Sequence, residues 1–324
     1  MLQDNHQRQF HYLRLSITDV CNFKCNYCLP DGYQCDSSRD FLSLNEIRLL
    51  VTSFAELGVS KIRITGGEPA LRKDLAEIIA TIKAVPGIKN VALTTNGYNL
   101  EQNVEHWYRA GLDALNVSID SLDAEAFRTI TGSNRHQSIL AGIDKAIALG
   151  VPVIKVNCVL MRQYNLAHLP VFLDWLKNKP VSLRFIELMQ TGDNTTFFAE
   201  QYVNGEQIKE QVEQRGWLPI VKRKDAGPAQ EYSHPDYTGK LGFILPYSKD
   251  FCASCNRLRV SALGNLHKCL FAEEGQSLRH MLQSQRQSEA LKSWLKQQLQ
   301  TKEVSHFLHS QQVGATKHLA MLGG

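Results

Sequence analysis

Six of the chain's eight cysteines fall into two tight groups, and each group supplies three thiols. The first group is a C-x3-C-x2-C run and the second is C-x2-C-x13-C; their members are Cys21, Cys25 and Cys28, and Cys252, Cys255 and Cys269. Three thiolates can bind three irons of a 4Fe-4S cluster and leave the fourth iron open to a small molecule. An open position of this kind distinguishes a catalytic metal site from a closed structural one. Both groups therefore predict 4Fe-4S clusters.

Zinc is the alternative metal at each group. Cys35 or His11 could complete a four-ligand zinc site at the first group, and His267 could do so at the second. Zinc sites usually bring their cysteines as pairs separated by a longer gap, so the triple run of the first group favours iron. At the second group a Cys3His zinc site stays open as an alternative.

Three basic residues interrupt runs that are otherwise apolar. Arg14, Arg63 and Lys155 each stand among aliphatic side chains, where a charge is costly to bury unless it is paired. A carboxylate such as Asp120 or Glu187 is one candidate partner. Several cations that converge on one cavity would need several anions instead, and a triphosphate supplies them.

Two further arginines, Arg257 and Arg259, follow Cys255 of the second cysteine group at alternate positions. In extended backbone, alternate side chains face the same side. Guanidinium groups bind phosphate oxygens in a bidentate manner, so such a pair beside a cluster indicates a polyanionic substrate. A solvated surface pair is the alternative.

A scaffold that holds these residues is predicted from short apolar runs that alternate with amphipathic stretches. The predicted strands are 12–17, 61–65, 90–94, 114–119, 152–159 and 182–188, and the predicted helices lie near 43–58, 75–82, 100–111, 139–147 and 166–176. Ser43 followed by Glu46 predicts a capping box at the start of the first helix. Six strand–helix units predict an α/β fold with a parallel sheet and right-handed crossovers. Because a closed barrel needs eight units, we expect a partial (βα)6 TIM-like barrel with its sites at the carboxyl ends of the strands.

The strand–helix alternation fails after about residue 195. We therefore expect a barrel core over residues 1–195 and a C-terminal α+β subdomain over residues 196–324 that carries the second cluster. Within this subdomain, 239–246 is predicted to be a strand and 276–300 a polar, glutamine-rich helix.

Composition excludes several classes of protein. The formal net charge of +4 is too small to argue for nucleic-acid binding by itself. No secretory signal is visible at the N-terminus, and no stretch approaches the roughly 20 apolar residues of a membrane helix. We expect a cytoplasmic protein without nucleic-acid or membrane partners, in which cysteines serve as metal ligands more often than as disulfides.

The first cysteine run, with the aromatic Tyr27 before its last cysteine, resembles the signature of the radical S-adenosylmethionine (SAM) superfamily. The segment 66–69, Gly-Gly-Glu-Pro, is similar to that superfamily's GGE motif, which contacts the methionyl amino group of SAM. The resemblance implies that SAM is the cosubstrate. It also implies four SAM-binding residues, namely Tyr27, Gly67, Ser118 and Met189.

Much of the chain resembles the GTP 3',8-cyclase family of molybdenum cofactor biosynthesis. The matching segments are 14–19, 94–97, 130–132, 242–244, 255–257 and the terminal Gly323-Gly324. This resemblance implies a second 4Fe-4S cluster and a double-glycine tail that activity requires. It further implies GTP contacts at Arg14, Arg63, Thr94, Lys155, Arg257, Leu258 and Arg259.

The activity implied by the resemblance is that of a lyase in which no side chain acts as nucleophile or acid–base catalyst. Reductive cleavage of SAM gives a 5'-deoxyadenosyl radical that abstracts H3' of GTP. Bonding of C3' to C8 then leads to 3',8-cyclo-7,8-dihydroguanosine 5'-triphosphate. The implied partners are an electron donor and the next enzyme of the molybdopterin pathway, and the chain would be a monomer or homodimer.

Two other functions remain alternatives. A two-cluster radical SAM enzyme that modifies a peptide would share the first motif, but such enzymes usually carry more C-terminal cysteines. A non-catalytic iron–sulfur electron carrier would complete its cluster with four cysteines and would need neither the GGE motif nor a barrel.

Overall fold

The computed structural model describes residues 1–324 apart from 35–39, 223–225, 272–274, 311–312, 315–318 and 324. Two residues considered above, Cys35 and Gly324, therefore lie outside the described residues. The described cysteines are all free thiols. No helix in the described part of the chain is long and apolar enough to cross a membrane.

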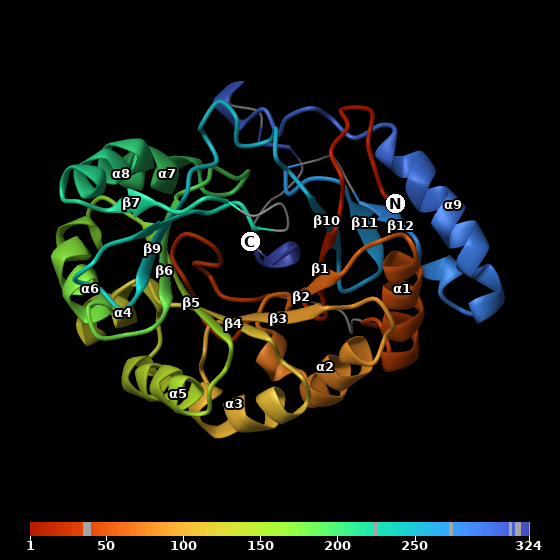
Figure 1. Cartoon of the computed structure of the whole chain (residues 1–324), viewed down its shortest axis with the longest axis horizontal. Coiled ribbons are helices and arrows are strands. Elements are labelled where there is room, and N and C mark those ends of the chain that lie inside the picture. Colours follow the sequence, from red (N-terminus) through yellow and green to blue (C-terminus); the bar gives the residue numbers. More distant parts are fainter. Residues whose placement is uncertain (35–39, 223–225, 272–274, 311–312, 315–318, 324) are drawn as a thin grey trace.

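All six predicted strands form, and each pairs in parallel with the next. They are β1 (Tyr12–Ser16), β2 (Lys61–Thr65), β3 (Asn90–Thr95), β4 (Ala114–Ser118), β5 (Val153–Leu160) and β6 (Ser182–Glu187). The helices that follow are α1 (Leu44–Glu56), α2 (Leu75–Lys83), α3 (Leu100–Arg109), α4 (Ala124–Thr131), α5 (His136–Ala148) and α6 (Leu169–Leu176). Figure 1 shows the strands in an open arc with these helices on its outer side. The expected partial barrel is confirmed.

Strands from the C-terminal part of the chain extend the parallel sheet on both sides. β9 (Lys240–Ile244) pairs in parallel with β6, and β10 (Arg257–Val260) pairs in parallel with β1. Short antiparallel strands complete the two edges: β8 (Gln230–Ser233) and β7 (Leu218–Pro219) beyond β9, and β11 (Asn265–His267) and β12 (Gln276–Ser277) beyond β10. The helices α7 (Thr195–Gln201) and α8 (Gly205–Gln214) precede β7. The C-terminal α+β part is thus continuous with the barrel sheet.

The parallel register places three arginines side by side across the sheet. Arg259 of β10 is the partner of Arg14 on β1, and Arg14 is in turn the partner of Arg63 on β2. In-register residues of neighbouring strands project to the same face. Distant segments of the sequence therefore deliver their charges to one place inside the arc.

The predicted helix over 276–300 is wrong in its first half. Gln276–Ser277 pairs with β11, and two short 3-10 turns follow at Arg279–Met281 and Gln285–Gln287. The helix itself, α9, spans only Ser288–Leu299. Polar composition alone did not reveal the break, because Leu278 and Leu282 are buried against the barrel core and hold this segment in a non-helical path.

The capping box predicted for α1 is confirmed, and it links the C-terminal part to the barrel. Glu46 accepts a hydrogen bond from the Ser43 backbone at 2.9 Å, and the Ser43 hydroxyl accepts from the Glu46 backbone. Arg279 donates to the same carboxylate, Nε to Oε1, at 2.7 Å. Burial opposes ionisation of Glu46, but the bonds from Arg279 and Ser43 outweigh it and lower the pKa to about 2.

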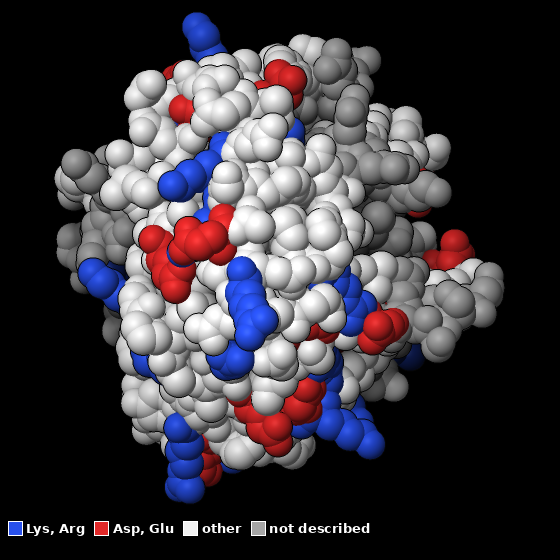
Figure 2. Space-filling model, turned by 90° about the vertical axis from the view of Figure 1, so that its right-hand side faces the viewer, with Lys and Arg blue, Asp and Glu red and all other residues white. Residues whose placement is uncertain are grey.

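Figure 2 shows the face of the molecule that lies on the right of Figure 1. Basic and acidic side chains are interspersed on this face, without a broad patch of one sign. Such mixing is typical of a solvated surface. The basic residues of chemical interest are those that the sheet places inside the arc.

We expect Glu46→Gln to lower the free energy of unfolding at pH 7 by about 1–2 kcal/mol, the usual cost of a lost helix cap. Because the folded pKa of Glu46 lies below its unfolded value, the carboxylate's stabilisation is present above about pH 4.5 and is lost as the pH falls toward about 2. The difference in free energy of unfolding between the unmodified chain and Glu46→Gln should therefore shrink below pH 4.5. Urea unfolding of the metal-free chain measures this difference.

Glu77→Gln is the matched control. Glu77 lies in the first turn of α2, where no side-chain capping bond is formed. Its substitution should change stability by less than about 0.5 kcal/mol. Equal effects of the two substitutions would contradict the role given to the Glu46 cap.

Candidate functional site

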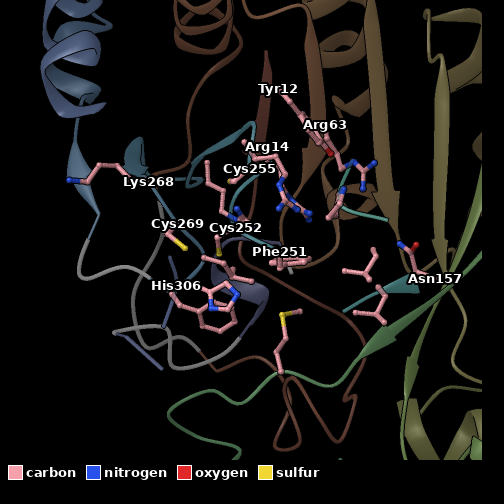
Figure 3. Close-up of a pocket in the computed structure, with 18 of the residues that line it drawn as sticks. Tyr12, Arg14, Arg63, Asn157, Phe251, Cys252, Cys255, Lys268, Cys269 and His306 are labelled. Atoms are coloured by element: carbon pink, nitrogen blue, oxygen red, sulfur yellow. The ribbon is translucent and has the colours of Figure 1, made fainter. Parts of the chain in front are cut away.

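A pocket opens inside the arc of strands and is bordered by the second cysteine group. Figure 3 shows Cys252, Cys255 and Cys269 on one side of it, close to Arg14 and Arg63. Six basic side chains line the pocket, namely Arg14, Arg63, Arg184, Arg257, Arg259 and Lys268, and no described Asp or Glu is among the lining residues. The pocket is therefore strongly electropositive.

Electrostatic strain among these cations is visible in their pKa values. Burial and the neighbouring arginines lower the pKa of Arg14 and of Arg63, and burial together with Arg257 lowers that of Arg259 to about 10. The Nε atoms of Arg63 and Arg259 are buried without a hydrogen-bond partner. For Lys155, on β5, burial and the nearby Arg184 and Arg63 lower the pKa to about 6. Such an arrangement favours an anionic ligand.

The carboxylates that competed for these cations lie elsewhere. Asp120 accepts hydrogen bonds from the Tyr27 hydroxyl at 2.9 Å and from the Val159 backbone at 2.8 Å. Glu187 accepts from the Tyr202 hydroxyl at 2.7 Å. Glu231 is the carboxylate that pairs with a barrel cation, Arg184, at 2.5 Å. No sequence signal pointed to Glu231, since it stands on β8, a short antiparallel strand in the irregular C-terminal part.

Two expected nucleotide contacts occupy different environments. The Thr94 hydroxyl, on β3, is buried without a hydrogen-bond partner. The Leu258 side chain belongs to the hydrophobic core, so only its backbone is available to a ligand.

Asn157 and Tyr12 also line the pocket and were not singled out from sequence, because an isolated Asn or Tyr on a strand carries no distinctive pattern.

The second cysteine group has the chemistry of a metal-ligand set. Burial raises the pKa of Cys255, but Arg257 and Lys302 outweigh this effect and lower it to about 7, which favours the thiolate. Burial raises the pKa of Cys252, against hydrogen bonds to its sulfur from the His306 backbone N–H and the Ser305 hydroxyl, the latter at 3.7 Å. His267 stands on β11 opposite Arg259.

The first cysteine group lies on the loop between β1 and α1. Burial raises the pKa of Cys25, helped by nearby Asp120, and burial with the Cys21 charge raises that of Cys28 to about 12. These thiols hold their protons until a metal displaces them. Within the described part of the chain, no three His, Cys, Asp or Glu side chains converge on a single metal ion.

The Gly-Gly-Glu-Pro turn packs directly on the loop that leads into the first cysteine group. A Cβ on Gly67 would lie 2.5 Å from the carbonyl oxygen of Asp19 and closer still to that of Val20. Glu68 is fully buried and accepts hydrogen bonds from Thr95 at 2.7 Å and from the Asn96 backbone at 2.6 Å. Glycine is thus required for the close approach of two backbones.

The other residues expected to bind SAM lie on the first cysteine loop or at the carboxyl ends of strands. The Tyr27 hydroxyl is fixed by Asp120, and Ser118 is the last residue of β4. Met189 follows β6, lines the pocket and packs against the small apolar cluster formed by Leu270, Phe271, Leu308, Leu319 and Leu322.

The C-terminal tail enters the arc between the two cysteine groups, where Figure 1 marks the chain end. Leu319 and Leu322 pack in the small apolar cluster, which also contacts Cys28 and Cys269. The Cys28 sulfur accepts hydrogen bonds from the backbone of Ala320 and Leu319, and the Gly323 carbonyl accepts one from Arg14. A Cβ on Gly323 would overlap the Thr65 side chain, so the tail fits because this residue is glycine.

Two protein families match the sequence. Residues 15–176 match the Radical SAM superfamily, and residues 181–308 match the family described as Molybdenum Cofactor Synthesis C. The first match contains Cys21, Cys25 and Cys28, and the second contains the other three cysteines of the two groups.

Curated relatives align over nearly the whole chain. A GTP 3',8-cyclase of Vibrio vulnificus (strain CMCP6) is 53% identical over 99% of this chain and 97% of its own length. A GTP 3',8-cyclase of Vibrio cholerae serotype O1 (strain ATCC 39541) is 54% identical with the same coverage. One from Psychromonas ingrahamii is 53% identical over 100% of this chain and 95% of its own.

Solved structures support the fold. Streptococcus suis SuiB bound to the precursor peptide SuiA aligns with a TM-score of 0.61 at 14% identity, covering 89% of this chain and 67% of that one. SuiB bound to S-adenosylmethionine aligns with a TM-score of 0.60. At this identity the likeness concerns the fold alone.

We expect Gly67→Ala to disturb the first cysteine group, because the added methyl would push back the backbone at Asp19 and Val20. Overpacking of this kind costs about 1–3 kcal/mol of folding free energy. The measurement is the iron bound per chain after anaerobic reconstitution, in a form whose Cys252, Cys255 and Cys269 are replaced by Ala. We predict less than about half the iron of the parent form.

Gly227→Ala is the matched control, since a Cβ there meets nothing within 4 Å. This variant should bind iron as the parent does. Full iron binding by Gly67→Ala would contradict the packing described for the Gly-Gly-Glu-Pro turn.

Proposed function

Because the chain belongs to the GTP 3',8-cyclase family of radical SAM enzymes, we propose that it converts GTP to 3',8-cyclo-7,8-dihydroguanosine 5'-triphosphate in molybdenum cofactor biosynthesis. The observation that carries this proposal is the in-register set of buried cations, Arg259, Arg14 and Arg63, in a pocket that the second cysteine triad also lines. A polyanion whose phosphates bind the arginines, and whose other end reaches a metal cluster on the cysteines, fits that arrangement.

The radical SAM family implies a 4Fe-4S cluster and SAM. Cys21, Cys25 and Cys28 would hold this cluster. When bound and reduced, this cluster would supply the electron for cleavage of SAM to methionine and a 5'-deoxyadenosyl radical, which would take H3' of GTP before C3' joins C8. The purine radical left by that bond would need a second electron and a proton from the external donor and solvent to give the dihydro product. The tight loop packing described above makes the cluster loop rigid, and rigid positioning is the protein's main contribution to cofactor chemistry.

The SAM site is proposed to lie between this loop and the ends of β2, β4 and β6. Gly67 brings backbone polar groups close to the loop, where the amino group of the methionyl part would bind. The Tyr27–Asp120 hydrogen bond fixes one wall, and Ser118 and Met189 would contact the remainder of the molecule.

The second cysteine group is proposed to hold a second 4Fe-4S cluster through Cys252, Cys255 and Cys269. The lowered pKa of Cys255 and the hydrogen bonds to the Cys252 sulfur support thiolate ligation. The open iron would face the same pocket as the arginines and would anchor the purine. A Cys3His zinc site completed by His267 is the alternative.

The triphosphate is proposed to bind among the barrel cations. The contacts would come from the side chains of Arg14, Arg63, Thr94, Lys155, Arg257 and Arg259 and from the backbone of Leu258. These groups would neutralise charge and orient the ribose without exchanging protons with it. The Gly323 carbonyl is bonded to Arg14, so the tail with Gly323 and Gly324 would help to place that guanidinium.

Other features of the proposal concern the protein's surroundings. We propose a cytoplasmic enzyme of two parts, residues 1–195 and 196–324, acting as a monomer or homodimer. It requires an external electron donor, since SAM cleavage consumes one electron. Its product would pass to the next enzyme of the molybdopterin pathway.

The test is anaerobic: both cysteine groups are loaded with iron and sulfide, and dithionite and SAM are added with GTP, with ATP or without nucleotide. We expect 5'-deoxyadenosine to rise only with GTP, together with a cyclised GTP product. Cleavage that is indifferent to GTP would favour a different substrate, such as a peptide. Absence of 5'-deoxyadenosine at full iron content would favour an electron carrier.

Lys155 gives a prediction on pH. In the free chain Lys155 is neutral above about pH 6, and phosphate oxygens would return its pKa toward the usual value of about 10.4. Between these two pKa values, GTP binding is therefore accompanied by the uptake of one proton by Lys155. The affinity for GTP should therefore fall about tenfold per unit as the pH rises from about 7.5 to 9, as followed by anaerobic calorimetry.

Lys155→Arg is the control, because arginine keeps its charge over this range. Its GTP affinity should not vary with pH between the same limits. A flat profile for the unmodified chain, or a sloping one for Lys155→Arg, would contradict the placement of Lys155 at the triphosphate.

A further inference from the structure

The N-terminal residues form a small hairpin that contacts the second cysteine group. Gln3 and Gln9 form a bridge, and the Asp4 carboxylate accepts hydrogen bonds from the backbone of His6 and Arg8 at 2.9 and 3.0 Å. Asp4 also pairs with the Arg8 guanidinium, Oδ2 to Nε, at 2.7 Å, and the two side chains are only 0% and 6% exposed. This buried ion pair holds Arg8 by Nε and leaves Nη1 and Nη2 free to donate to other groups.

Those nitrogens donate to three backbone carbonyls from two distant segments. Arg8 Nη1 donates to Val304 O at 2.7 Å and to Cys252 O at 3.2 Å, and Nη2 donates to Glu303 O at 2.5 Å. One side chain thus joins a cluster-ligand residue to the segment that begins the C-terminal tail. A guanidinium suits this role because its five donors lie in one rigid plane.

The residues directly after Val304 are those that bond to the Cys252 sulfur. The Ser305 hydroxyl donates to it at 3.7 Å, and the His306 backbone N–H also donates to it. Arg8 therefore holds the Cys252 backbone through its carbonyl. It also holds the segment whose next residues, Ser305 and His306, donate hydrogen bonds to the Cys252 sulfur.

A neighbouring contact holds the same segment near another ligand. The buried Lys302 donates from Nζ to the carbonyl of Lys268, which precedes Cys269. Lys302 also lies 5.7 Å from the ring centroid of Phe10, which follows the hairpin. Residues 302–306 therefore adjoin the second cysteine group, and Arg8 supplies two hydrogen bonds to this segment and one to Cys252.

We propose that Arg8, oriented by Asp4, is a positioning residue that sets the hydrogen bonding of Cys252 and through it the reduction potential of the second cluster. This inference rests on the proposed second cluster. Hydrogen bonds to ligand sulfurs and nearby charge both tune the potential of an iron–sulfur cluster, and donors stabilise its reduced, more negative form. Loss of the donors makes reduction less favourable.

The test uses full-length chain in which Cys21, Cys25 and Cys28 are replaced by Ala, so that only the second cysteine group can bind a cluster. Arg8→Lys is introduced into this form. Lysine keeps the positive charge but cannot bond to Asp4 and to three carbonyls at once. We expect full iron and sulfide content and a potential more negative by about 59 mV, a tenfold change in the reduction equilibrium for one electron. An EPR-monitored redox titration measures this shift.

Three variants serve as controls. Arg8→Lys in a chain with Cys252, Cys255 and Cys269 replaced by Ala should leave the potential of the first cluster unchanged. Arg279→Lys alters another arginine that bonds to a carboxylate and to backbone carbonyls, but it should leave the second cluster unchanged. Asp4→Asn should shift the second cluster in the same direction as Arg8→Lys.

Each contrary result has a separate meaning. A normal second cluster with an unchanged potential in Arg8→Lys overturns this inference alone. Equal loss of iron from both cysteine groups overturns it as well, because Arg8 would then support the fold in general. If the parent form with only the second cysteine group binds no iron–sulfur cluster, the proposed second cluster is wrong and this inference falls with it.

Discussion

Mutual repulsion among cations buried inside the barrel is the constraint on which much of this structure depends. Arg14, Arg63 and Arg259 stand in register on three adjacent strands. Burial and the charges of Arg184 and Arg63 lower the pKa of a further basic residue, Lys155, to about 6. Burial of like charges is costly unless anions compensate them. Glu231 pairs with Arg184, another arginine that lines the pocket, and the Gly323 carbonyl accepts a hydrogen bond from Arg14. The positive charge that these two contacts leave uncompensated is the charge that an incoming polyanion would neutralise.

The continuity of the sheet explains how this constraint arises. Had the C-terminal part folded as a separate unit, Arg257 and Arg259 would not lie beside β1. Because β10 joins β1 in parallel and Arg257 is the partner of Tyr12, the second cysteine group lies toward the amino end of β1, whereas the first group follows its carboxyl end. The tail then closes the space between the two groups, with its backbone bonded to Cys28 and its leucines packed beside Cys269. Segments about 300 residues apart in sequence thus form one chamber.

Local patterns in the sequence predicted the local features of this structure well. The six strands alternate with helices whose apolar stripes have the expected spacing, and the Ser43–Glu46 capping box is a short-range signal, so both were predicted correctly. The cysteine spacing identified the metal-ligand candidates for the same reason: all three members of the first run lie on one loop.

Features that depend on long-range pairing were not predicted. The stretch 276–300 was taken for one helix, because its burial against the barrel is set by a partner that periodicity does not reveal. The contact of Glu231 with Arg184 requires β8 to pair with β9, and the bonds of Arg8 to Cys252 and Val304 join the two ends of the chain. Tertiary packing decides such contacts, and composition near each residue carries no trace of them.

The central claim is that the buried cations are there for the phosphates of the substrate. Anaerobic calorimetry of GTP, GDP and GMP with the iron-loaded chain tests it most directly. A hydrogen bond to a charged group contributes about 1.5–3 kcal/mol, so the account predicts that affinity falls at least about tenfold with each phosphate removed. If GMP bound as tightly as GTP, the barrel cations would not be serving a triphosphate, and the account of the site would be wrong.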